Sequence, residues 1–486
     1  MNFARDVVDA AAPDRTAIVA LSREGERREL SFGEVAASSA ALASTLAAHG
    51  VRRGDVVLTL IGNRPEWVLA LIACFRLGAV ALPCNEQLRA KDLRLRLEAA
   101  APALVLCDAR NRDELDGAAP GCPVLTIPDP ALFAAEPAPA AELEPGDPCL
   151  IVFTSGTAGE PKGIVHAQRY LAGQALQAEH WLAPRPGELV WCTAASGWSK
   201  SARNAFIAPW LRGATAFLHD ARFDPAERLE LLRRERVNVL CMAPTEYRVM
   251  AKRVELGPCP DLRGLVAAGE ALNPELLHAW HDATGLDIRD GYGQTETGQL
   301  TGMPLDEPAR PGSMGRALPG VRIDVLDGEL VVDPTSVPTF FAHQLGDRGA
   351  RDRGAAATAW HTGDRVRRED DGFLYFEGRN DDVIISAGYR IGPFEVESAL
   401  VAHPAVAEAA VVAAPDEERG AVVRAVVVLR DGHAAGDGLA RELQQWVREQ
   451  TAPYKYPRII DFADALPKTA SGKIRRAQLR DGPARR

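Results

Sequence analysis

The chain has few aromatic residues, no closely spaced cysteines, no long apolar run and no excess of positive charge. Phe, Trp and Tyr together make up 6% of its 486 residues. No two of the eight cysteines lie closer than ten residues apart, which excludes a CxxC pair and a zinc-knuckle spacing. We therefore expect the cysteines to be small buried residues in a reducing compartment.

Neither a membrane span nor a secretory leader is indicated. The longest apolar stretch, Trp67–Phe75, ends at Arg76 and is too short to cross a bilayer. The first residues, MNFARDVVDAAAPDRTA, lack the apolar core of a signal peptide. The sequence thus predicts a cytoplasmic protein.

Acidic residues outnumber basic ones, 66 to 56, which gives a net charge of −10. This balance argues against a dedicated nucleic-acid-binding protein, because neutralising phosphates requires a basic face. It is compatible with a small anionic ligand in a locally positive cleft. The hydrophobic share of 47% and charged share of 25% are ordinary for globular proteins, and the length exceeds that of one domain.

Helical and strand patterns alternate along the chain. Residues 31–50 read as a helix with Ser31 as N-cap, Glu34 completing a capping box, and Gly50 as the stop. A strand at 54–60, a helix at 65–77 and a strand at 79–82 follow. This alternation predicts an α/β fold with mixed or largely parallel sheets and helices.

The pattern resumes after a Pro-rich and acidic connector at 128–148. Further strands are predicted at 149–155, 188–195, 214–220, 238–244, 264–270 and 286–293, and a hairpin with an Asp-Gly turn at 321–333. A compact α+β unit of about 105 residues follows Arg379, with strands near 405–413 and 421–430 and a helix at 437–450. We expect a large domain at 1–380 and a small one at 381–486.

The segment TSGTAGEPKG, residues 154–163, directly follows a predicted strand. Its glycines let backbone N–H groups turn toward an anion, its hydroxyls add donors and Lys162 adds a positive charge. These features suit a polyphosphate, although the Walker A spacing does not fit. The structural alternative is a plain surface turn.

A second segment, DGYGQTETG at 290–298, also follows a strand. Tyr292 offers a flat face for a ring, Gln294 and Thr295 offer hydrogen bonds, and Glu296 is an oxygen ligand suited to Mg²⁺. The alternative is a polar turn.

Three later segments carry further polar groups. In WHTGD, residues 360–364, Asp364 could hold ribose hydroxyls or cap a turn. In residues 378–397, Arg379 and Arg390 could contact phosphates or form surface ion pairs. In PKTASGKIRR, residues 467–476, Lys473 follows a Ser-Gly pair and alone would be a solvated loop lysine.

The five segments together, in this order, resemble the adenylate-forming superfamily, which includes acyl-CoA synthetases, peptide-synthetase adenylation domains and firefly-type luciferases. The resemblance spans about residues 31–476. It implies a two-step reaction in which a carboxylate attacks the α-phosphate of ATP to give an acyl-adenylate and pyrophosphate, and a thiol, normally coenzyme A, then attacks the adenylate. The enzyme must offset the repulsion between carboxylate and triphosphate and align the attack.

The resemblance assigns roles to individual residues. The loop matching Thr154 to Lys162 would hold the β- and γ-phosphates, and Glu296 would hold Mg²⁺. Asp364 and Arg379 would contact the ribose, and Lys473 would bridge substrate carboxylate and phosphate oxygens. The implied ATP-binding set is Thr154, Ser155, Gly156, Thr157, Ala158, Gly159, Lys162, Gly269, Glu270, Ala271, Asp290, Gly291, Tyr292, Gly293, Gln294, Thr295, Asp364, Arg379 and Lys473. Within it, Lys473, Glu296 and Thr295 are the expected catalytic residues.

The same resemblance makes the C-terminal domain a mobile lid with its hinge at Asp381. Ala387, Gly388, Tyr389 and Arg390 would then line the coenzyme A channel. The chain departs from the family pattern at Ala387, often Ser, at Ala158, often Thr, and most strongly over residues 340–358. Acetylation of Lys473 would remove the charge needed for adenylation, so a lysine acetyltransferase and deacetylase are hypothetical partners.

Several segments are most similar to medium-chain and benzoate-type acyl-CoA synthetases, among them SGWSKSA at 196–202. Acetyl-CoA synthetases carry Trp where this chain has Gly293, so a larger acyl pocket and a medium-chain, branched or aromatic acid are expected. Trp198, Ser199 and Tyr247 are candidate pocket residues, with core packing as the alternative. Two other hypotheses stay open: an adenylation enzyme that loads a carrier protein, and a nucleotide-binding protein without activity. The oligomeric state is not indicated.

Overall fold

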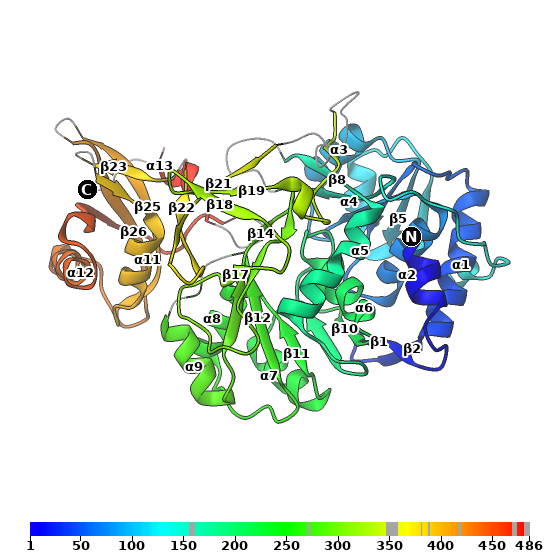
Figure 1. The fold of residues 1–486 in the computed structure, drawn as a ribbon, viewed down its shortest axis with the longest axis horizontal. Helices are drawn as coiled ribbons and strands as arrows, with labels where there is room; N and C mark the ends of the chain where they lie inside the picture. The colour runs from blue at the N-terminus through cyan, green and yellow to red at the C-terminus, as the bar shows by residue number, and fades with distance from the viewer. Residues whose placement is uncertain are drawn as a thin grey trace.

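The structure is a computed structural model. It describes residues 1–154, 161–269, 272, 274–346, 358–380, 382–386, 389–416, 419–468 and 474–480. A large N-terminal body and a small C-terminal unit lie side by side, and an antiparallel sheet runs between them (Figure 1). The predicted α/β class, with a large domain of mixed sheets and a small α+β unit, is confirmed.

The first large sheet is parallel except at one edge. Its strands, in spatial order, are β13 (Ile288–Gly291), β12 (Gly264–Ala268), β11 (Val239–Cys241), β9 (Leu189–Cys192), β10 (Thr215–His219), β1 (Thr16–Leu21) and β2 (Arg27–Ser31). Only the β1–β2 pair is antiparallel. The carboxyl ends of the parallel strands therefore meet at one edge, where ligands bind in sheets of this kind.

The second large sheet has the same mixed character. Its order is β20 (His343–Gln344), β8 (Gly163–Ala167), β7 (Pro148–Phe153), β4 (Val80–Cys84), β3 (Val56–Leu60), β5 (Leu104–Asp108) and β6 (Val124–Ile127). β7 and β8 are antiparallel, and the turn between them carries the first predicted motif.

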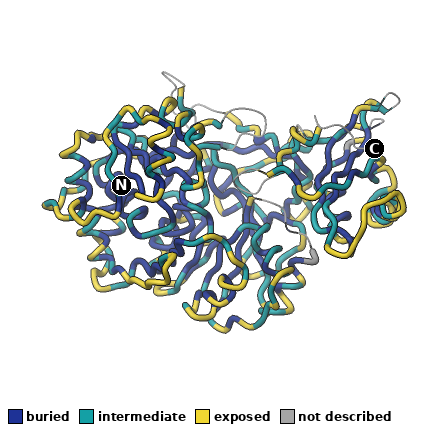
Figure 2. Tube along the Cα trace, turned by 180° about the vertical axis from the view of Figure 1, so that it is seen from behind, coloured by how far each residue is buried: buried dark blue, intermediate teal, exposed yellow. Residues whose placement is uncertain are grey.

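Helices lie on both faces of both sheets, which gives five layers. The middle layer is formed by α1 (Phe32–Ala48), α2 (Pro65–Leu77), α5 (Gln168–Gln177) and α6 (Ala208–Leu211), buried between the sheets in one apolar core. On the far side of the first sheet lie α7 (Pro225–Arg234), α8 (Pro244–Arg253) and α9 (Pro274–Thr284). On the far side of the second lie α3 (Ala90–Ala100) and α4 (Arg112–Gly117). Figure 2 shows the buried strands inside each body and the exposed positions outside.

Local signals explain the predicted N-terminal elements. The capping box of α1 is present, since Ser31 Oγ accepts from Glu34 N at 3.2 Å and the Glu34 carboxylate accepts from Ser31 N at 2.7 Å. α2 begins at Pro65 and ends at Leu77, as predicted. The hairpin predicted at 321–333 is β18 (Ile323–Leu326) and β19 (Glu329–Val332), and Asp327 and Gly328 both have positive φ in its turn.

The C-terminal unit has a core of its own. β18, β19, β21 (Trp360–Arg368) and β22 (Leu374–Arg379) form the sheet between the bodies. Beyond it, an apolar cluster of described residues between 384 and 462 packs β23 (Ile384–Ser386), β24 (Tyr389–Ile391), β25 (Val406–Asp416), β26 (Gly420–Leu429) and β27 (Ile459–Phe462) against α11 (Pro393–Val401) and α12 (Asp437–Gln450). The short α13 (Arg476–Arg480) ends the described chain. The domain boundary at residue 380 stays a prediction.

Among the residues that the structure describes, every helix is too short or too polar to pass through a membrane.

Candidate active site

Asp364 lies at the centre of a polar cluster that joins three of the predicted motifs. Its Oδ2 accepts from the hydroxyl of Tyr292 at 2.5 Å and from Nε2 of Gln294 at 2.8 Å. Its Oδ1 accepts from Arg379 Nη1 at 3.1 Å. Asp364 is 5% exposed, so these three donors fix the orientation of its carboxylate. Sequence-distant residues predicted to serve one nucleotide are therefore in direct contact.

Strand register explains how these residues meet. β21 and β22 pair antiparallel with Asp364 opposite Arg379. Tyr292 directly follows β13, and Gln294 belongs to the short strand β14 (Gly293–Gln294), which pairs with β15 (Gly298–Gln299). The Trp360 indole N–H donates to Gln294 Oε1 at 3.1 Å, and Gln294 Nε2 also donates to the Thr362 carbonyl at 2.8 Å. Sequence reasoning missed Trp360 and Thr362, although both lie inside the WHTGD motif.

The backbone at Gly293 lies very close to a neighbouring strand. A Cβ at this position would lie 1.9 Å from the carbonyl oxygen of Gly298 across the β14–β15 pair. The residue is therefore glycine because two backbones approach closely, and it does not line the cavity described below. The predicted role of Gly293 in the acyl pocket stays a prediction.

Glu296 and Lys162 belong to different motifs and lie near enough to interact electrostatically. Burial raises the pKa of the Glu296 carboxyl, while Arg379 and Lys162 lower it and Asp364 raises it further. Lys162 stands at the base of the predicted phosphate loop, where Thr154 N donates to the Lys162 carbonyl at 2.9 Å. A partly buried carboxylate beside two cations has the donor chemistry that a hard divalent cation requires.

Two further predicted residues lie at the carboxyl ends of β12 and β13. Asp290 is 5% exposed and its Oδ1 accepts from Gly291 N at 2.8 Å, and burial raises the pKa of this carboxyl. Gly269 directly follows β12. Thr295 stands in the turn between β14 and β15.

A narrow, mostly apolar cavity opens next to these strand ends. Its volume is about 10 Å³, room for about one water molecule. The lining residues are Trp181, Cys192, Ala194, Trp198, Lys200, Cys241, Met242, Ala243, Glu246 and Ala268. Trp198 was predicted to line an acyl pocket, and the structure places it in this wall.

The other two pocket candidates lie elsewhere. Ser199 is not part of the cavity wall. The Tyr247 side chain is fully buried, its hydroxyl donates to the carbonyls of Leu240 and Val266 at 3.1 and 3.2 Å, and its ring packs edge-on against Trp280. Tyr247 therefore packs in the core behind the wall, which was the alternative considered for it.

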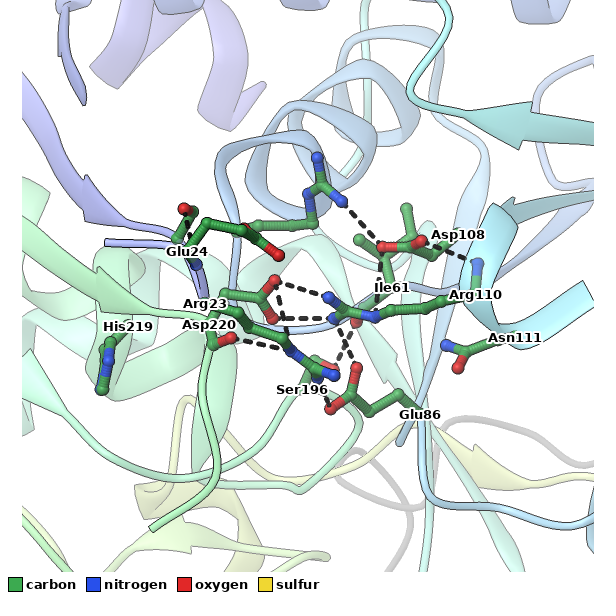
Figure 3. A network of polar contacts seen from close by, with 12 residues as sticks. Arg23, Glu24, Ile61, Glu86, Asp108, Arg110, Asn111, Ser196, His219 and Asp220 are labelled. Carbon is green, nitrogen blue, oxygen red and sulfur yellow. Dashed lines mark hydrogen bonds and ion pairs between the residues drawn. The ribbon is translucent and has the colours of Figure 1, made fainter. Parts of the chain in front are cut away.

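The loop that carries Trp198 and Lys200 is anchored at its start. Ser196 Oγ donates to the Ile61 carbonyl at 2.5 Å, and Ser196 N donates to Asn63 Oδ1 at 2.8 Å. Below this anchor, Arg110 pairs with both oxygens of Asp220 at 2.7 and 2.8 Å and with Glu86 (Figure 3). This partly buried network joins loops from both large sheets and so fixes the position of the cavity wall.

Several predicted site residues lie outside the described residues. These are Ser155, Gly156, Thr157, Ala158, Gly159, Glu270, Ala271, Asp381, Ala387, Gly388 and Lys473. Of Arg390 only the backbone, in β24, is described. Tyr389 is 52% exposed and its ring stacks on that of Tyr454 at 4.4 Å. Most of residues 340–358, which matched no family pattern, are also outside the described set.

Comparison with known proteins agrees with the site geometry. Residues 5–338 match the AMP-binding enzyme family and residues 395–473 match the AMP-binding enzyme C-terminal domain. The chain is 39% identical to the uncharacterized acyl-CoA ligase YtcI of Bacillus subtilis, over 97% of this chain and 94% of the relative. It is 36% identical to mitochondrial acyl-coenzyme A synthetase ACSM3 of Rattus norvegicus, over 99% and 90%.

A solved structure shows the same arrangement over the full length. The benzoate CoA ligase of Burkholderia xenovorans LB400 superposes with a TM-score of 0.87 at 28% identity, covering 99% of this chain and 100% of that one. The family matches cover both bodies, and the relatives match over nearly their full length. The contact of Asp364 with Tyr292 and Gln294 is consistent with these matches. The chain belongs to the AMP-binding enzyme family, among its acyl-CoA synthetases.

Proposed function

We propose that this chain joins a carboxylic acid to coenzyme A at the expense of ATP. In the first step a carboxylate oxygen bonds to the α-phosphorus and the bond to pyrophosphate breaks, giving acyl-AMP and pyrophosphate. In the second step the thiol of coenzyme A attacks the acyl carbon, releasing AMP and one proton. The observation that carries the proposal is the contact of Asp364 with Tyr292, Gln294 and Arg379 beside Glu296 and Lys162.

The cluster around Asp364 suits a ribose. A carboxylate offers about four acceptor positions, and three are filled by protein donors, so a hydroxyl can still donate to it. Arg379 is 35% exposed in its side chain and can turn to a ligand oxygen. The flat ring of Tyr292 stands beside the same carboxylate and supplies a surface for the adenine.

The positive charges suit the triphosphate. Lys162 closes the base of the loop at 154–163, and its ammonium reduces the repulsion that an incoming carboxylate meets. We assign Glu296 as the residue that would hold Mg²⁺, which supplies charge neutralisation on the phosphate oxygens when bound. Lys473 would add the positive charge between carboxylate and phosphate during adenylation, and its acetylation would remove that charge.

The C-terminal unit is assigned to the second step. We place the domain boundary at residue 380 with the hinge at Asp381, and the coenzyme A channel along Ala387, Gly388, Tyr389 and Arg390. The eight cysteines are free and mostly buried, which fits the reducing cytoplasm that we propose as the compartment.

The experiment is a panel of carboxylic acids offered to the purified chain with ATP and Mg²⁺, with medium-chain, branched and aromatic acids included. Pyrophosphate release and coenzyme A consumption are followed separately. Acid-dependent release of pyrophosphate coupled to loss of free thiol supports the proposal. Pyrophosphate release without use of coenzyme A contradicts the thiol assignment, and no release with any acid contradicts the adenylation step.

A further inference from the structure

Two cysteines lie side by side at the carboxyl edge of the first large sheet. Cys192 ends β9 and Cys241 ends β11, and the parallel register sets them directly opposite each other. Neighbouring strands lie about 4.8 Å apart, and directly paired residues point to the same face of the sheet. That spacing falls within the Cα separation of about 4.4–6.8 Å that a disulfide spans. The backbone therefore holds two free thiols where a disulfide can close.

The two thiols contact each other. The Cys241 thiol donates a hydrogen bond to the sulfur of Cys192. Asn204 Nδ2 also donates to the Cys241 sulfur, and the Cys192 thiol donates to the Lys200 carbonyl, each at 3.6 Å. The bond between the sulfurs lowers the pKa of Cys192 and raises the pKa of Cys241. One sulfur is thus favoured as the nucleophile while the other keeps its proton beside it.

The other cysteines lack this arrangement. The structure describes all eight, and in the strand registers of the described residues no other two cysteines are paired. Burial raises the pKa of each of the six remaining thiols. Cys192 is therefore the thiol of this chain with the greatest thiolate character, and it has a second thiol in contact.

The cavity gives small molecules access to the pair. Cys192 and Cys241 both line it and are 2% and 4% exposed. Trp198, Lys200 and Glu246 in the same wall are half-buried, so that side of the wall borders solvent. The volume of about 10 Å³ admits a molecule close to water in size. Hydrogen peroxide exceeds water by one oxygen atom and reacts through one end, whereas a peptide disulfide is too large to enter.

We propose that Cys192 and Cys241 are a peroxide-sensitive dithiol, and that their oxidation to a disulfide lowers the use of the acid substrate. The Cys192 thiolate attacks one oxygen of hydrogen peroxide, the O–O bond breaks and hydroxide leaves, which gives a sulfenic acid. The Cys241 sulfur then attacks the Cys192 sulfur, the S–O bond breaks and water is released as the S–S bond forms. In sum, two thiols and one peroxide give one disulfide and two water molecules.

Oxidation changes the cavity wall because both sulfurs take part in its hydrogen bonds. The disulfide removes the hydrogen that Cys192 donates to the Lys200 carbonyl and fixes the ends of β9 and β11 to each other. Lys200 Nζ in turn donates to the Ala268 carbonyl at the end of β12, at 2.7 Å. A shift of this loop therefore reaches the strand end before the predicted adenine segment. Formation of the disulfide is independent of the proposed function, and only its effect on activity rests on that function.

The test treats the reduced full-length chain with hydrogen peroxide, blocks the remaining thiols with iodoacetamide and digests the chain without reduction. Mass spectrometry then identifies which cysteine peptides are linked. The wild-type chain, Cys192→Ala and Cys241→Ala are compared. Cys122→Ala, at a half-buried cysteine that does not line the cavity, is the matched control. Initial rates with an acid from the panel are measured before peroxide, after peroxide and after dithiothreitol.

In the wild-type chain, a peptide pair joined through Cys192 and Cys241 should appear, lighter by two hydrogen atoms than the sum of the free peptides. Peroxide should lower kcat/KM for the acid about tenfold, since a small displacement of a wall that positions substrate is costly, and dithiothreitol should restore it. Neither Cys192→Ala nor Cys241→Ala should form the link, and Cys192→Ala should keep its own activity under peroxide. Cys122→Ala should respond as the wild-type chain does.

Three results would overturn the inference. They are the absence of the linked peptides after peroxide, a link that forms with unchanged kcat/KM, and an equal loss of activity in Cys192→Ala. The link is read by mass without turnover in the wild-type chain, so a variant that unfolds does not remove this test. Absence of pyrophosphate release with every acid would contradict the proposed function and the effect on activity, whereas the linked peptides would still establish the dithiol.

Discussion

Asp364 holds together residues from three separate motifs, and its chemistry can be isolated by a substitution that keeps its shape. In Asp364→Asn the amide cannot accept from Tyr292, Gln294 and Arg379 at once. We expect kcat/KM for ATP to fall about 100-fold or more, since charge-assisted hydrogen bonds are lost in a buried site. Initial rates over a range of ATP concentrations measure this.

The control for this substitution is Asp14→Asn, a change of the same chemistry at an exposed residue. It should leave the kinetics for ATP unchanged. Equal rates in Asp364→Asn and the wild-type chain would show that Asp364 does not contact the nucleotide.

His166 gives a prediction for the pH dependence of stability. The ring is fully buried in β8 and packs on Tyr170 at 4.1 Å, and burial, with nearby Arg203 and Arg169, lowers its pKa from an ordinary 6.5 to about 3. The unfolded chain therefore binds this proton more readily than the folded one, and stability falls as pH drops from 6.5 toward 3. At pH 5 the penalty is about 2 kcal/mol.

Urea unfolding at pH 7 and pH 5 measures this effect in the wild-type chain and in His166→Phe, which keeps a ring against Tyr170. The variant should lose less stability between the two pH values than the wild-type chain. His433→Phe, at an exposed position, should keep the full dependence. An identical pH dependence in His166→Phe would contradict a neutral buried imidazole.

Some site residues could be predicted from the sequence and others could not, for physical reasons. Tyr292, Gln294 and Asp364 stand in motifs that are rich in glycine and hydroxyl groups. Such motifs can be recognised from the sequence alone. Their contact spans about 70 residues of chain and depends on strand order, which no local signal encodes. Lys200 was not singled out from the sequence, and the structure places it in the cavity wall.

At the scale of elements, we expect the packing of the loop between β9 and Trp198 to affect how well the chain uses its acid substrate. Gly197 has φ of +88°, and a Cβ there would lie 2.4 Å from Asn85 N. Gly197→Ala should therefore displace the loop, destabilise the fold by about 2 kcal/mol and reduce kcat/KM for the acid more than for ATP. Urea unfolding and substrate titrations at fixed ATP measure both effects.

Gly187→Ala separates the two causes of this loss. Gly187 also has positive φ, +81°, but a Cβ there meets nothing within 4 Å. It should lose about 1 kcal/mol of stability with no change in acid specificity. If Gly187→Ala and Gly197→Ala behaved alike, the contact with residue 85 would not position the cavity wall.

Elements were predictable where their signals are local. The first helix follows from Ser31 and Glu34, whose capping box needs only four residues of sequence. The hairpin at 323–332 follows from its Asp-Gly turn. The pair β14–β15 was not predictable, because Gly293 and Gly298 look like turn residues until their backbones are seen in contact.

At the scale of the whole molecule, the apolar core of the C-terminal unit and the cores of the large body have no residue in common among those the structure describes. We expect two calorimetric transitions. Val411→Ala, in the C-terminal core, should lower the free energy of unfolding of that unit by about 1–3 kcal/mol. The midpoint temperature of only one transition should therefore fall. Val57→Ala, in the central core of the large body, should lower the midpoint temperature of the other transition only. One transition that shifts with both substitutions would show that the two bodies unfold together.

The central claim is that the chain makes an acyl-adenylate and passes its acyl group to coenzyme A. The most direct measurement is a single turnover with excess enzyme, ATP, Mg²⁺ and a carboxylic acid that proves to be a substrate in the panel. The reaction is quenched at low pH and its products are separated by chromatography. Without coenzyme A, the account predicts that acyl-AMP accumulates in step with pyrophosphate. On addition of coenzyme A it should disappear as thioester and AMP form in equal amounts. Thioester formation without acyl-AMP, or ADP in place of AMP, would contradict the account.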